Sequence, residues 1–269
     1  MKIKANKALG QHFLFSREIC DSIVSSAPRI QGAVVIEIGP GHGSLTSAIL
    51  QQQPKHLFMI EKDKLLAVKL KAMYQDRDDV SVICADALKI NIAQLSSQKV
   101  IIISNLPYNI GTELLCDWLC HASDRISHMT LMLQKELVER VCALKTSPNY
   151  GRLSVLCQLL AKCSKSFDVD AKLFTPPPKV TSSILQIEPL DLHLDQELFK
   201  LFQQILRIAF SARRKMLRKA LGDFFNEDDF YSLNIPATLR PQDLSSADFW
   251  RIAAFYKAKV AALKVDERF

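Results

Sequence analysis

The chain has 269 residues, of which 48% are hydrophobic and 23% are charged, and its formal net charge is +7. This length and apolar content are sufficient for a buried core in one or two domains. No apolar stretch approaches the ~20 residues that span a bilayer, so we expect no membrane-spanning segment. The basic excess fits a polyanionic partner such as nucleic acid or an acidic membrane surface, although basic proteins without such partners are common.

The first half of the sequence alternates short apolar runs with helical patterns. The runs predicted as strands are 33–39, 56–61, 80–86, 99–105 and 128–134, and the helical patterns are 44–53, 64–74, 113–122 and 135–144. This alternation predicts a mainly parallel sheet with helices on both faces, a Rossmann-like α/β domain. The segments 165–170 and 180–190 are predicted to close the sheet as further strands.

The composition changes after Leu190. The segments 195–225 and 245–264 have helical periodicity, and we find no convincing strand beside them. We therefore expect a first domain over 1–190 and a smaller all-helical domain over 191–269, packed together because no Gly- or Ser-rich linker separates them.

Seven cysteines are spread along the chain, an odd number that lies mostly in apolar segments. This pattern predicts reduced, buried thiols in a cytoplasmic protein. The stretch "CDWLCH" contains Cys116, Cys120 and His121, but no second ligand pair follows it. Core cysteines are therefore favoured over a zinc site, and we expect no metal. The basic start, "MKIKANKALGQHFLF", lacks the apolar block of a signal peptide.

A glycine loop and two acids follow the first three predicted strands. Gly39, Gly41 and Gly43 lie in "VIEIGPGHGSLT", and the next two strands end near Glu61 and Asp86. Glycine allows a close backbone approach to a ligand, and ligands of open parallel sheets bind at the carboxyl ends of the strands. Carboxylates there can accept hydrogen bonds from ribose hydroxyls and an adenine amino group. A nucleoside is favoured over a plain turn with solvent-facing acids.

The order of "QHFL", "EIGPGHGSLT", "IEKD", "ADAL", "NLPYNI" and "FTPPPKVTSSIL" resembles the S-adenosylmethionine-dependent rRNA adenine N6-dimethyltransferases over most of residues 7–190. The helical tail is most similar to the bacterial members linked to kasugamycin sensitivity. Those members dimethylate two adjacent adenosines in a hairpin loop near the 3′ end of 16S rRNA. The resemblance implies a monomeric enzyme that acts on 16S rRNA in the small subunit or its precursor during ribosome biogenesis, with S-adenosylmethionine as cofactor and no membrane partner.

The resemblance also implies a set of cofactor-binding residues. Gly39 and Gly41 would approach the amino-acid part of the cofactor, Glu61 would hold the ribose, and Asp86 with the Ala87 backbone would hold the adenine. The N-terminal arm, residues 1–30, would close this site through His12 and Leu14, and Asn105 would border it. Many relatives carry Asn where this chain has His12.

The stretch "NLPY" predicts how a target adenine is held. The Asn105 side-chain oxygen and the Leu106 carbonyl can accept from its exocyclic amine as positive charge develops on nitrogen. Pro107 restricts Leu106 to an extended conformation, and Tyr108 can stack on a flipped base. The resemblance implies that Phe174 supplies the opposite face. An ordinary turn with a packed tyrosine is the alternative.

The stretch "RIAFSARRKMLRK", residues 207–219, contains six basic residues and no acid. These residues are Arg207, Arg213, Arg214, Lys215, Arg218 and Lys219. On one continuous helix, Arg214 with Arg218 and Lys215 with Lys219 would each share a face, as a stripe for RNA phosphates. A solvated helix face is the alternative. Lys2, Lys4 and Lys7 would add to the same positive field.

Three other functions fit parts of the sequence. A related large-subunit rRNA methylase that confers macrolide resistance shares the catalytic motifs, and only the helical domain separates the two. A non-catalytic assembly factor would keep the fold, but the intact acids and "NLPY" argue against it. A nicotinamide dehydrogenase is disfavoured because the glycine spacing is not G-x-G-x-x-G.

Overall fold

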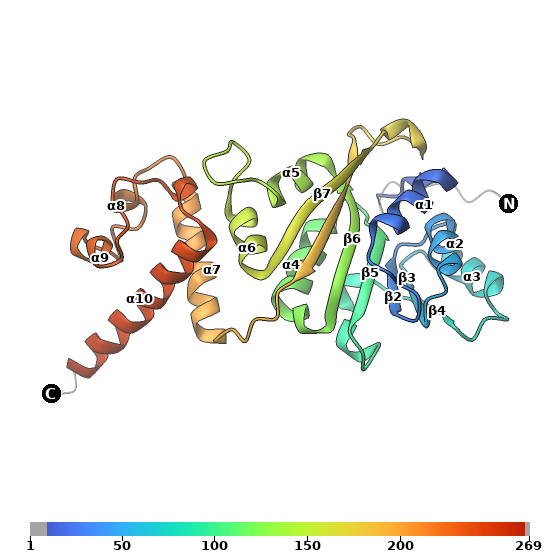
Figure 1. The fold of residues 1–269 in the computed structure, drawn as a ribbon, viewed down its shortest axis with the longest axis horizontal. Helices are drawn as coiled ribbons and strands as arrows, with labels where there is room; N and C mark the ends of the chain where they lie inside the picture. Colours follow the sequence, from blue (N-terminus) through green and yellow to red (C-terminus); the bar gives the residue numbers. More distant parts are fainter. Residues whose placement is uncertain (1–9, 267–269) are drawn as a thin grey trace. The chain divides into compact units, whose positions relative to one another are not determined.

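The structure is a computed structural model that describes residues 10–266 (Figure 1). The lysines at positions 2, 4 and 7 lie outside these residues, as does the start of the predicted N-terminal arm. Two compact units are formed. The first contains the described residues up to Glu139 together with Leu160–Asp191, and the second contains Arg140–Leu159 and the described residues from Leu192 onwards.

This division differs from the expected continuous domains in one segment, Arg140–Leu159, which groups with the C-terminal helices. The Tyr150 side chain is 1% exposed, and its hydroxyl donates to the Leu244 carbonyl at 2.8 Å. The Thr146 amide donates to the Gln242 carbonyl at 2.9 Å. Sequence periodicity cannot indicate that this segment belongs to the second unit, because the contacts join residues about a hundred positions apart.

The first unit is built on a seven-stranded sheet in the order β4-β3-β2-β5-β6-β9-β7. The strands are β2 (Val34–Ile38), β3 (His56–Glu61), β4 (Val80–Cys84), β5 (Val100–Asn105), β6 (Ile126–Gln134), β7 (Ala161–Val169) and β9 (Ser182–Pro189). All pairings from β4 to β6 are parallel, and β9 pairs antiparallel with both β6 and β7. The predicted α/β class with a mainly parallel sheet is confirmed.

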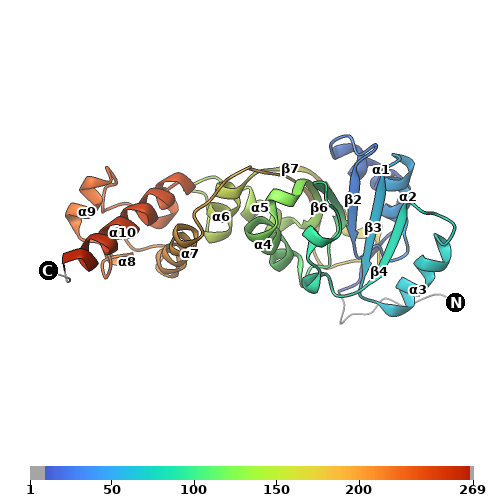
Figure 2. The same cartoon turned by 90° about the horizontal axis from the view of Figure 1, so that it is seen from below.

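The helices of the first unit connect these strands, as Figures 1 and 2 show. They are α1 (Arg17–Ser26), α2 (Ser44–Gln51), α3 (Lys64–Met73), α4 (Gly111–His121) and the start of α5 (Lys135–Val141). The sheet order reverses direction between β2 and β5: β3 and β4 lie on one side of this pair, and β6 lies on the other. In open parallel sheets, such a switch point creates a crevice at the carboxyl ends of the strands.

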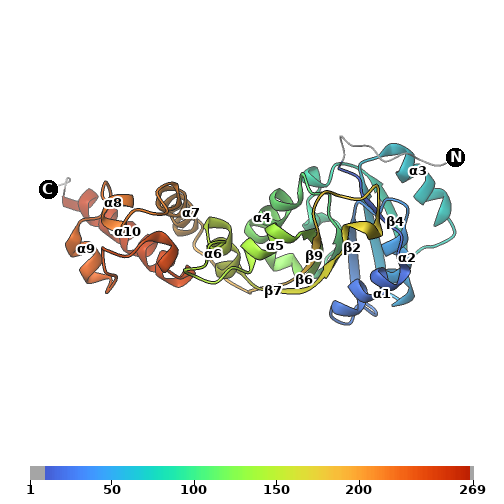
Figure 3. The same cartoon turned by 90° about the horizontal axis from the view of Figure 1, so that it is seen from above.

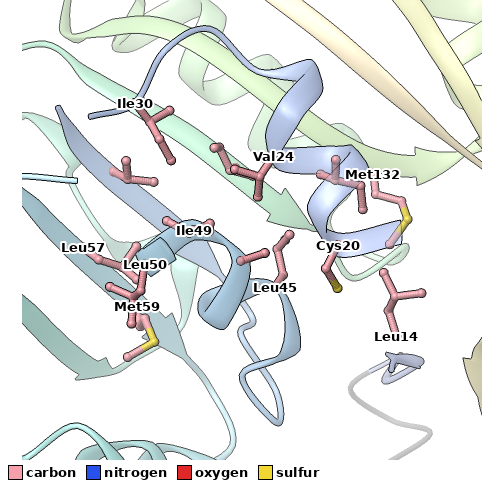
Figure 4. Close-up of a cluster of buried hydrophobic side chains, with 14 of the residues drawn as sticks. Leu14, Cys20, Val24, Ile30, Leu45, Ile49, Leu50, Leu57, Met59 and Met132 are labelled. Atoms are coloured by element: carbon pink, nitrogen blue, oxygen red, sulfur yellow. The ribbon is translucent and has the colours of Figure 1, made fainter. Parts of the chain in front are cut away.

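A two-stranded pairing ties the N-terminal segment to the first unit. Strand β1 (Phe13–Leu14) runs antiparallel to β8 (Phe174–Thr175), with Leu14 opposite Phe174. Leu14 is 6% exposed and belongs to the hydrophobic cluster formed by α1, α2 and the sheet (Figure 4). Residues 13–14 are therefore anchored in the core.

The cysteines are less buried than predicted. Of the seven, only Cys20 and Cys157 are buried, and Cys84 is exposed at the end of the edge strand β4. Cys116 and Cys120 both lie on α4 and are half-buried. The prediction failed because apolar neighbours in sequence do not reveal which strand forms the edge of the sheet.

The second unit is built from helices joined by turns and loops, and its described residues form no strand apart from the sheet of the first unit. It contains α6 (Arg152–Leu160), α7 (Gln196–Ser211), α8 (Leu217–Ala220), α9 (Glu227–Ser232) and α10 (Ser246–Asp266). Helices α7 and α10 pack side by side (Figure 3), with Phe202 and Trp250 ring centroids 5.6 Å apart. Within residues 10–266, no helix combines the length and the apolar character needed to cross a membrane.

The predicted continuous helix over 207–219 is wrong. Helix α7 ends at Ser211, residues 212–216 form turns, and α8 begins only at Leu217. Leu217 is fully buried, and its amide donates to the Leu239 carbonyl at 2.7 Å. The Arg218 amide likewise donates to the Ala237 carbonyl at 3.1 Å. These contacts with a distant segment replace the hydrogen bonds that a continuous helix would make.

Candidate functional site

A cavity opens at the carboxyl ends of β2, β3, β4 and β5, where the sheet order reverses. The predicted residues that line it are His12, Leu14, Gly39, Gly41, Glu61, Asp86, Ala87, Asn105, Leu106, Pro107 and Tyr108. The fold thus brings together eleven residues that lie on five separate stretches of the sequence.

The loop after β2 forms one wall of the cavity. Gly39 and Gly41 have φ angles of +64° and +60°, a backbone conformation that side chains disfavour. A Cβ atom on Gly41 would lie 3.0 Å from the ring of Phe13, and one on Gly39 would lie 3.7 Å from the ring of Pro107. Glycine is therefore required for the loop to pass close to β1 and beside the "NLPY" segment.

Glu61, at the end of β3, is 5% exposed and is held by backbone donors. The Gly41 amide donates to its Oε2 at 3.1 Å, and the Asp63 amide donates to its Oε1 at 2.9 Å. Burial raises the pKa of Glu61, and these two hydrogen bonds oppose that rise. A carboxylate has about four acceptor positions, so both oxygens can still accept from a ligand.

Asp86 and Ala87 follow β4 on the neighbouring side of the cavity. The Asp86 Oδ2 accepts from the Lys62 Nζ at 2.7 Å, and its Oδ1 accepts from the Leu88 amide at 3.2 Å. The Lys62 contact lowers the pKa of Asp86, which keeps this carboxyl ionised and able to accept. Lys62 was not predicted, although it stands directly between Glu61 and Asp63 in sequence.

A second buried acid, Glu37, also lines the cavity and was missed. It lies in the middle of β2, is 1% exposed, and accepts from the Thr46 hydroxyl at 2.6 Å. Burial raises its pKa from the ordinary 4.5 to about 8. The available signal was a single acid inside the apolar run "VVIEIG", a position where an acid needs a partner.

The "NLPY" segment leaves β5 at the switch point. Leu106 is 1% exposed, and its amide donates to the Met132 carbonyl at 3.2 Å, which fixes the segment against β6. Among the residues that the structure describes, no donor is bonded to the Leu106 carbonyl. The Pro107 carbonyl accepts from the amides of Ile110 and Gly111, where α4 begins. The Leu106 carbonyl therefore remains an available acceptor.

Asn105 and Tyr108 are both held by residues from distant parts of the chain. The Asn105 Nδ2 donates to the His12 carbonyl at 3.3 Å. The Tyr108 hydroxyl is hydrogen-bonded to the hydroxyl of Ser182, a fully buried residue of β9, at 2.6 Å. Burial raises the pKa of Tyr108. Ser182 was not predicted because it lies 74 positions away in the sequence.

His12 lies against the same segment. Its ring stacks on the Tyr108 ring, with centroids 5.7 Å apart and an angle of 29° between the planes. Its Nδ1 is hydrogen-bonded to the Pro176 carbonyl at 2.8 Å. His12 thus contacts both "NLPY" and "FTPPP", the two motifs that were predicted to hold the base.

Phe174 is the one predicted residue of the base-binding set that the structure does not bring to the cavity. Its side chain is 3% exposed, belongs to the hydrophobic cluster around α1 and α2, and does not line the cavity. Its backbone pairs with Leu14. In this arrangement Phe174 anchors β1 to the core and offers no stacking face.

The six predicted RNA-binding residues all lie in the second unit. Arg207, Arg214, Lys215, Arg218 and Lys219 are exposed. Arg213 is half-buried and donates from Nη2 to the Ser147 carbonyl at 3.1 Å, and Arg218 pairs with Glu227 at 3.5 Å. The structure therefore leaves an exposed basic segment without the regular stripe of a single helix.

The switch-point cavity, the glycine loop and the strand-end acids define a methyltransferase-type α/β domain with an appended helical unit. The sequence profile of the family described as "Ribosomal RNA adenine dimethylase" matches residues 2–258. The chain belongs to this family, and the predicted family membership is confirmed.

Relatives with established names cover nearly the whole chain. The "Ribosomal RNA small subunit methyltransferase A" of Neorickettsia sennetsu is 38% identical over 92% of this chain and 96% of its own length. The protein of the same name from Ehrlichia ruminantium is 40% identical over 93% of this chain and 97% of its own. The chain is therefore an enzyme of the adenine dimethylase type, as predicted.

Two solved structures share the fold over almost its full extent. A dimethyladenosine transferase from Plasmodium falciparum has a TM-score of 0.79 at 26% identity and covers 92% of this chain and 98% of its own. The 23S rRNA methyltransferase ErmE has a TM-score of 0.70 at 22% identity and covers 91% and 99%. The second likeness shows the fold alone.

Proposed function

We propose that the protein transfers methyl groups from S-adenosylmethionine to the N6 amines of two adjacent adenosines in a hairpin loop near the 3′ end of 16S rRNA. The observation that carries this proposal is the convergence of the glycine loop, Glu61, Asp86 and "NLPY" on one cavity at the ends of adjacent strands. The small-subunit names of the curated relatives support the choice of rRNA.

The cavity fits the cofactor that the family implies. Gly39 and Gly41 present bare backbone, Glu61 offers acceptors for ribose hydroxyls, and ionised Asp86 offers acceptors for an amino group. Leu14 and the ring of His12 border the same space. When bound, S-adenosylmethionine supplies an electrophilic methyl group on a positively charged sulfur.

The chain's own groups then act on the adenine amine, whose lone pair is delocalised into the ring. Because the Asn105 Nδ2 donates to the His12 carbonyl, its Oδ1 is the end that is left to accept from the amine. The Leu106 carbonyl is the second acceptor. Together they favour the geometry in which positive charge develops on nitrogen, and Tyr108 stacks on the base. Phe174 stays a prediction for the opposite face, and its burial does not support that role.

RNA is held by the exposed cations of the second unit. Arg207, Arg214, Lys215 and Lys219 form no ion pair with any described residue, so their charge is available to phosphates. Contacts of this kind position RNA and do not identify its sequence. We propose that the enzyme acts as a monomer in the cytoplasm, on the small subunit or its precursor.

Methylation of defined substrates tests this function. Purified protein is incubated with labelled S-adenosylmethionine and naked 16S rRNA, free small subunits or free large subunits, and modified nucleotides are mapped. We expect dimethylated adenosines at a pair of neighbouring positions in small-subunit rRNA only. Label in large-subunit rRNA would identify a large-subunit methylase instead. A decrease in the rate of labelling by folded Asn105→Ala, at saturating cofactor, excludes a contaminating activity.

A further inference from the structure

His12 engages both groups that are assigned to the target base. Its ring packs against the ring of Tyr108, with centroids 5.7 Å apart and an angle of 29° between the planes, and its backbone carbonyl accepts from the side-chain amide of Asn105. Its Nδ1 is hydrogen-bonded to Pro176, so the imidazole bridges the two base-binding motifs. We propose that this imidazole occupies the place of the target adenine on Tyr108 and leaves it when adenosine enters, an inference that rests on the proposed function.

The chemistry of the imidazole supports the proposal that it occupies the place of the target adenine. Both imidazole and adenine are flat, nitrogen-containing rings that stack on an aromatic face and form hydrogen bonds along their edges. The Tyr108 hydroxyl is fixed by Ser182, so the phenol ring stays in place while its partner changes. One stacking surface then serves His12 in the free enzyme and the base in the complex.

The anchoring of β1 allows the ring to leave without unfolding the segment. Leu14 is buried in the core, and β1 is paired with β8, so the backbone beside His12 is fixed. The His12 side chain itself is only half-buried. In the proposed exchange the His12 ring rotates about its side-chain bonds and breaks its hydrogen bond to the Pro176 carbonyl, whereas the hydrogen bond from Asn105 to the His12 backbone carbonyl is retained.

This exchange gives His12 a defined kinetic role. A group that competes with the base acts only on the free enzyme, so it raises KM for RNA and leaves kcat unchanged. The factor by which KM rises is the same for every RNA substrate, and it slows methylation only when the RNA concentration is below saturation.

Three variants measured at saturating cofactor test the proposal on free small subunits. His12→Asn removes the flat ring and retains a polar side chain, His12→Phe retains a ring, and His121→Asn is the matched exposed control on α4. We expect His12→Asn to lower the KM for subunits roughly two- to tenfold, the range that an aromatic pair contributes. His12→Phe and His121→Asn should show no decrease in KM.

An unchanged or higher KM in His12→Asn overturns the proposal and makes His12 a fixed wall of the site. A decrease in His12→Phe as large as in His12→Asn also overturns it, because the ring would then be irrelevant. If the wild-type protein labels no rRNA, the proposed function fails instead. Equilibrium binding of small subunits to the same variants then decides the role of His12 separately.

Discussion

The cavity of the first unit and the basic segment of the second unit, residues 207–219, fix their functional side chains in different ways. In the cavity, Glu61, Asn105 and Tyr108 are each held by a hydrogen bond of 3.3 Å or less to a backbone or hydroxyl group. In the basic segment, most side chains are exposed, and only Arg218 forms an ion pair with a described residue. Accurate placement therefore matters in the cavity, whereas summed charge matters in the segment.

The largest expected effect concerns the buried acid of the cavity. Glu37 has its pKa raised from 4.5 to about 8, so it is protonated in the folded chain and ionised in the unfolded chain at neutral pH. Stability from this group is complete below pH 4.5 and is lost as the pH rises through about 8. Glu37→Gln should remove this dependence, which is on the order of a few kcal/mol between pH 5 and pH 8. Thermal midpoints from pH 5 to 8 measure it, and a constant difference between variant and parent would contradict it.

Asn105→Ala should reduce methyl transfer roughly 100- to 1000-fold, because one preorganised acceptor is removed at the atom where charge develops. Cofactor affinity should change much less. Single-turnover methylation with saturating cofactor and RNA measures the rate, and calorimetry measures the affinity. Retention of the full rate would remove Asn105 from the chemistry.

Glu61→Ala should weaken cofactor binding by about 1.5–3 kcal/mol for each hydrogen bond to the charged carboxylate that it removes. The salt dependence of RNA binding should stay the same, since Glu61 binds no phosphate. Calorimetry with S-adenosylmethionine measures the loss, and Glu188→Ala, an exposed acid on β9, serves as the control. Equal affinities in the two variants would place the ribose elsewhere.

Changes in the basic segment should affect RNA binding and not cofactor binding, in contrast to Glu61→Ala. The double change Arg214→Glu and Lys215→Glu should weaken subunit binding several-fold and reduce the slope of log affinity against log salt by ~1 for each phosphate that is no longer neutralised. Cofactor affinity should not change. The matched control reverses Lys55 and Lys71, two exposed lysines of the first unit. Equal losses of affinity in both double variants would mean that only net charge matters.

The smallest effect is expected at the Tyr108 hydroxyl. Tyr108→Phe and Ser182→Ala should each slow methylation a few-fold, because each removes a hydrogen bond of about 0.5–1.5 kcal/mol that orients the ring. Tyr108→Ala should be far more damaging, since it removes the stacking face. The double variant Tyr108→Phe with Ser182→Ala should lose less activation free energy than the sum of the two single variants, because both remove the same hydrogen bond. If Tyr108→Phe is as damaged as Tyr108→Ala, the phenol has a chemical role beyond orientation.

The sequence alone allowed several residues of the cavity to be grouped, because the carboxyl ends of parallel strands lie at one edge of the sheet. Residues that follow parallel strands meet at one edge of the sheet, so Glu61, Asp86 and Asn105 could be grouped from their positions alone. Glu37 was hidden because it lies within a strand instead of after it. Ser182 was hidden because only the antiparallel pairing of β9 with β6 brings it to Tyr108.

For the basic segment, the sequence predicted the charge but not the backbone structure. Helical periodicity in 207–219 is genuine at both ends, but residues 212–216 turn because Leu217 and Arg218 bond to residues 239 and 237. Local propensity cannot indicate such contacts, and tertiary packing overrides it. The composition of the segment was informative, whereas its geometry was not.

The discontinuous second unit limits how the protein can be divided or recombined. A fragment that starts at residue 192 lacks Tyr150, whose hydroxyl is bonded to Leu244 and whose ring lies 6.4 Å from that of Phe210. Such a fragment would expose apolar surface that the intact chain covers. A chimaera that exchanges the helical unit between relatives must therefore carry two grafts, Arg140–Leu159 and the C-terminal helices, and the two must come from the same parent.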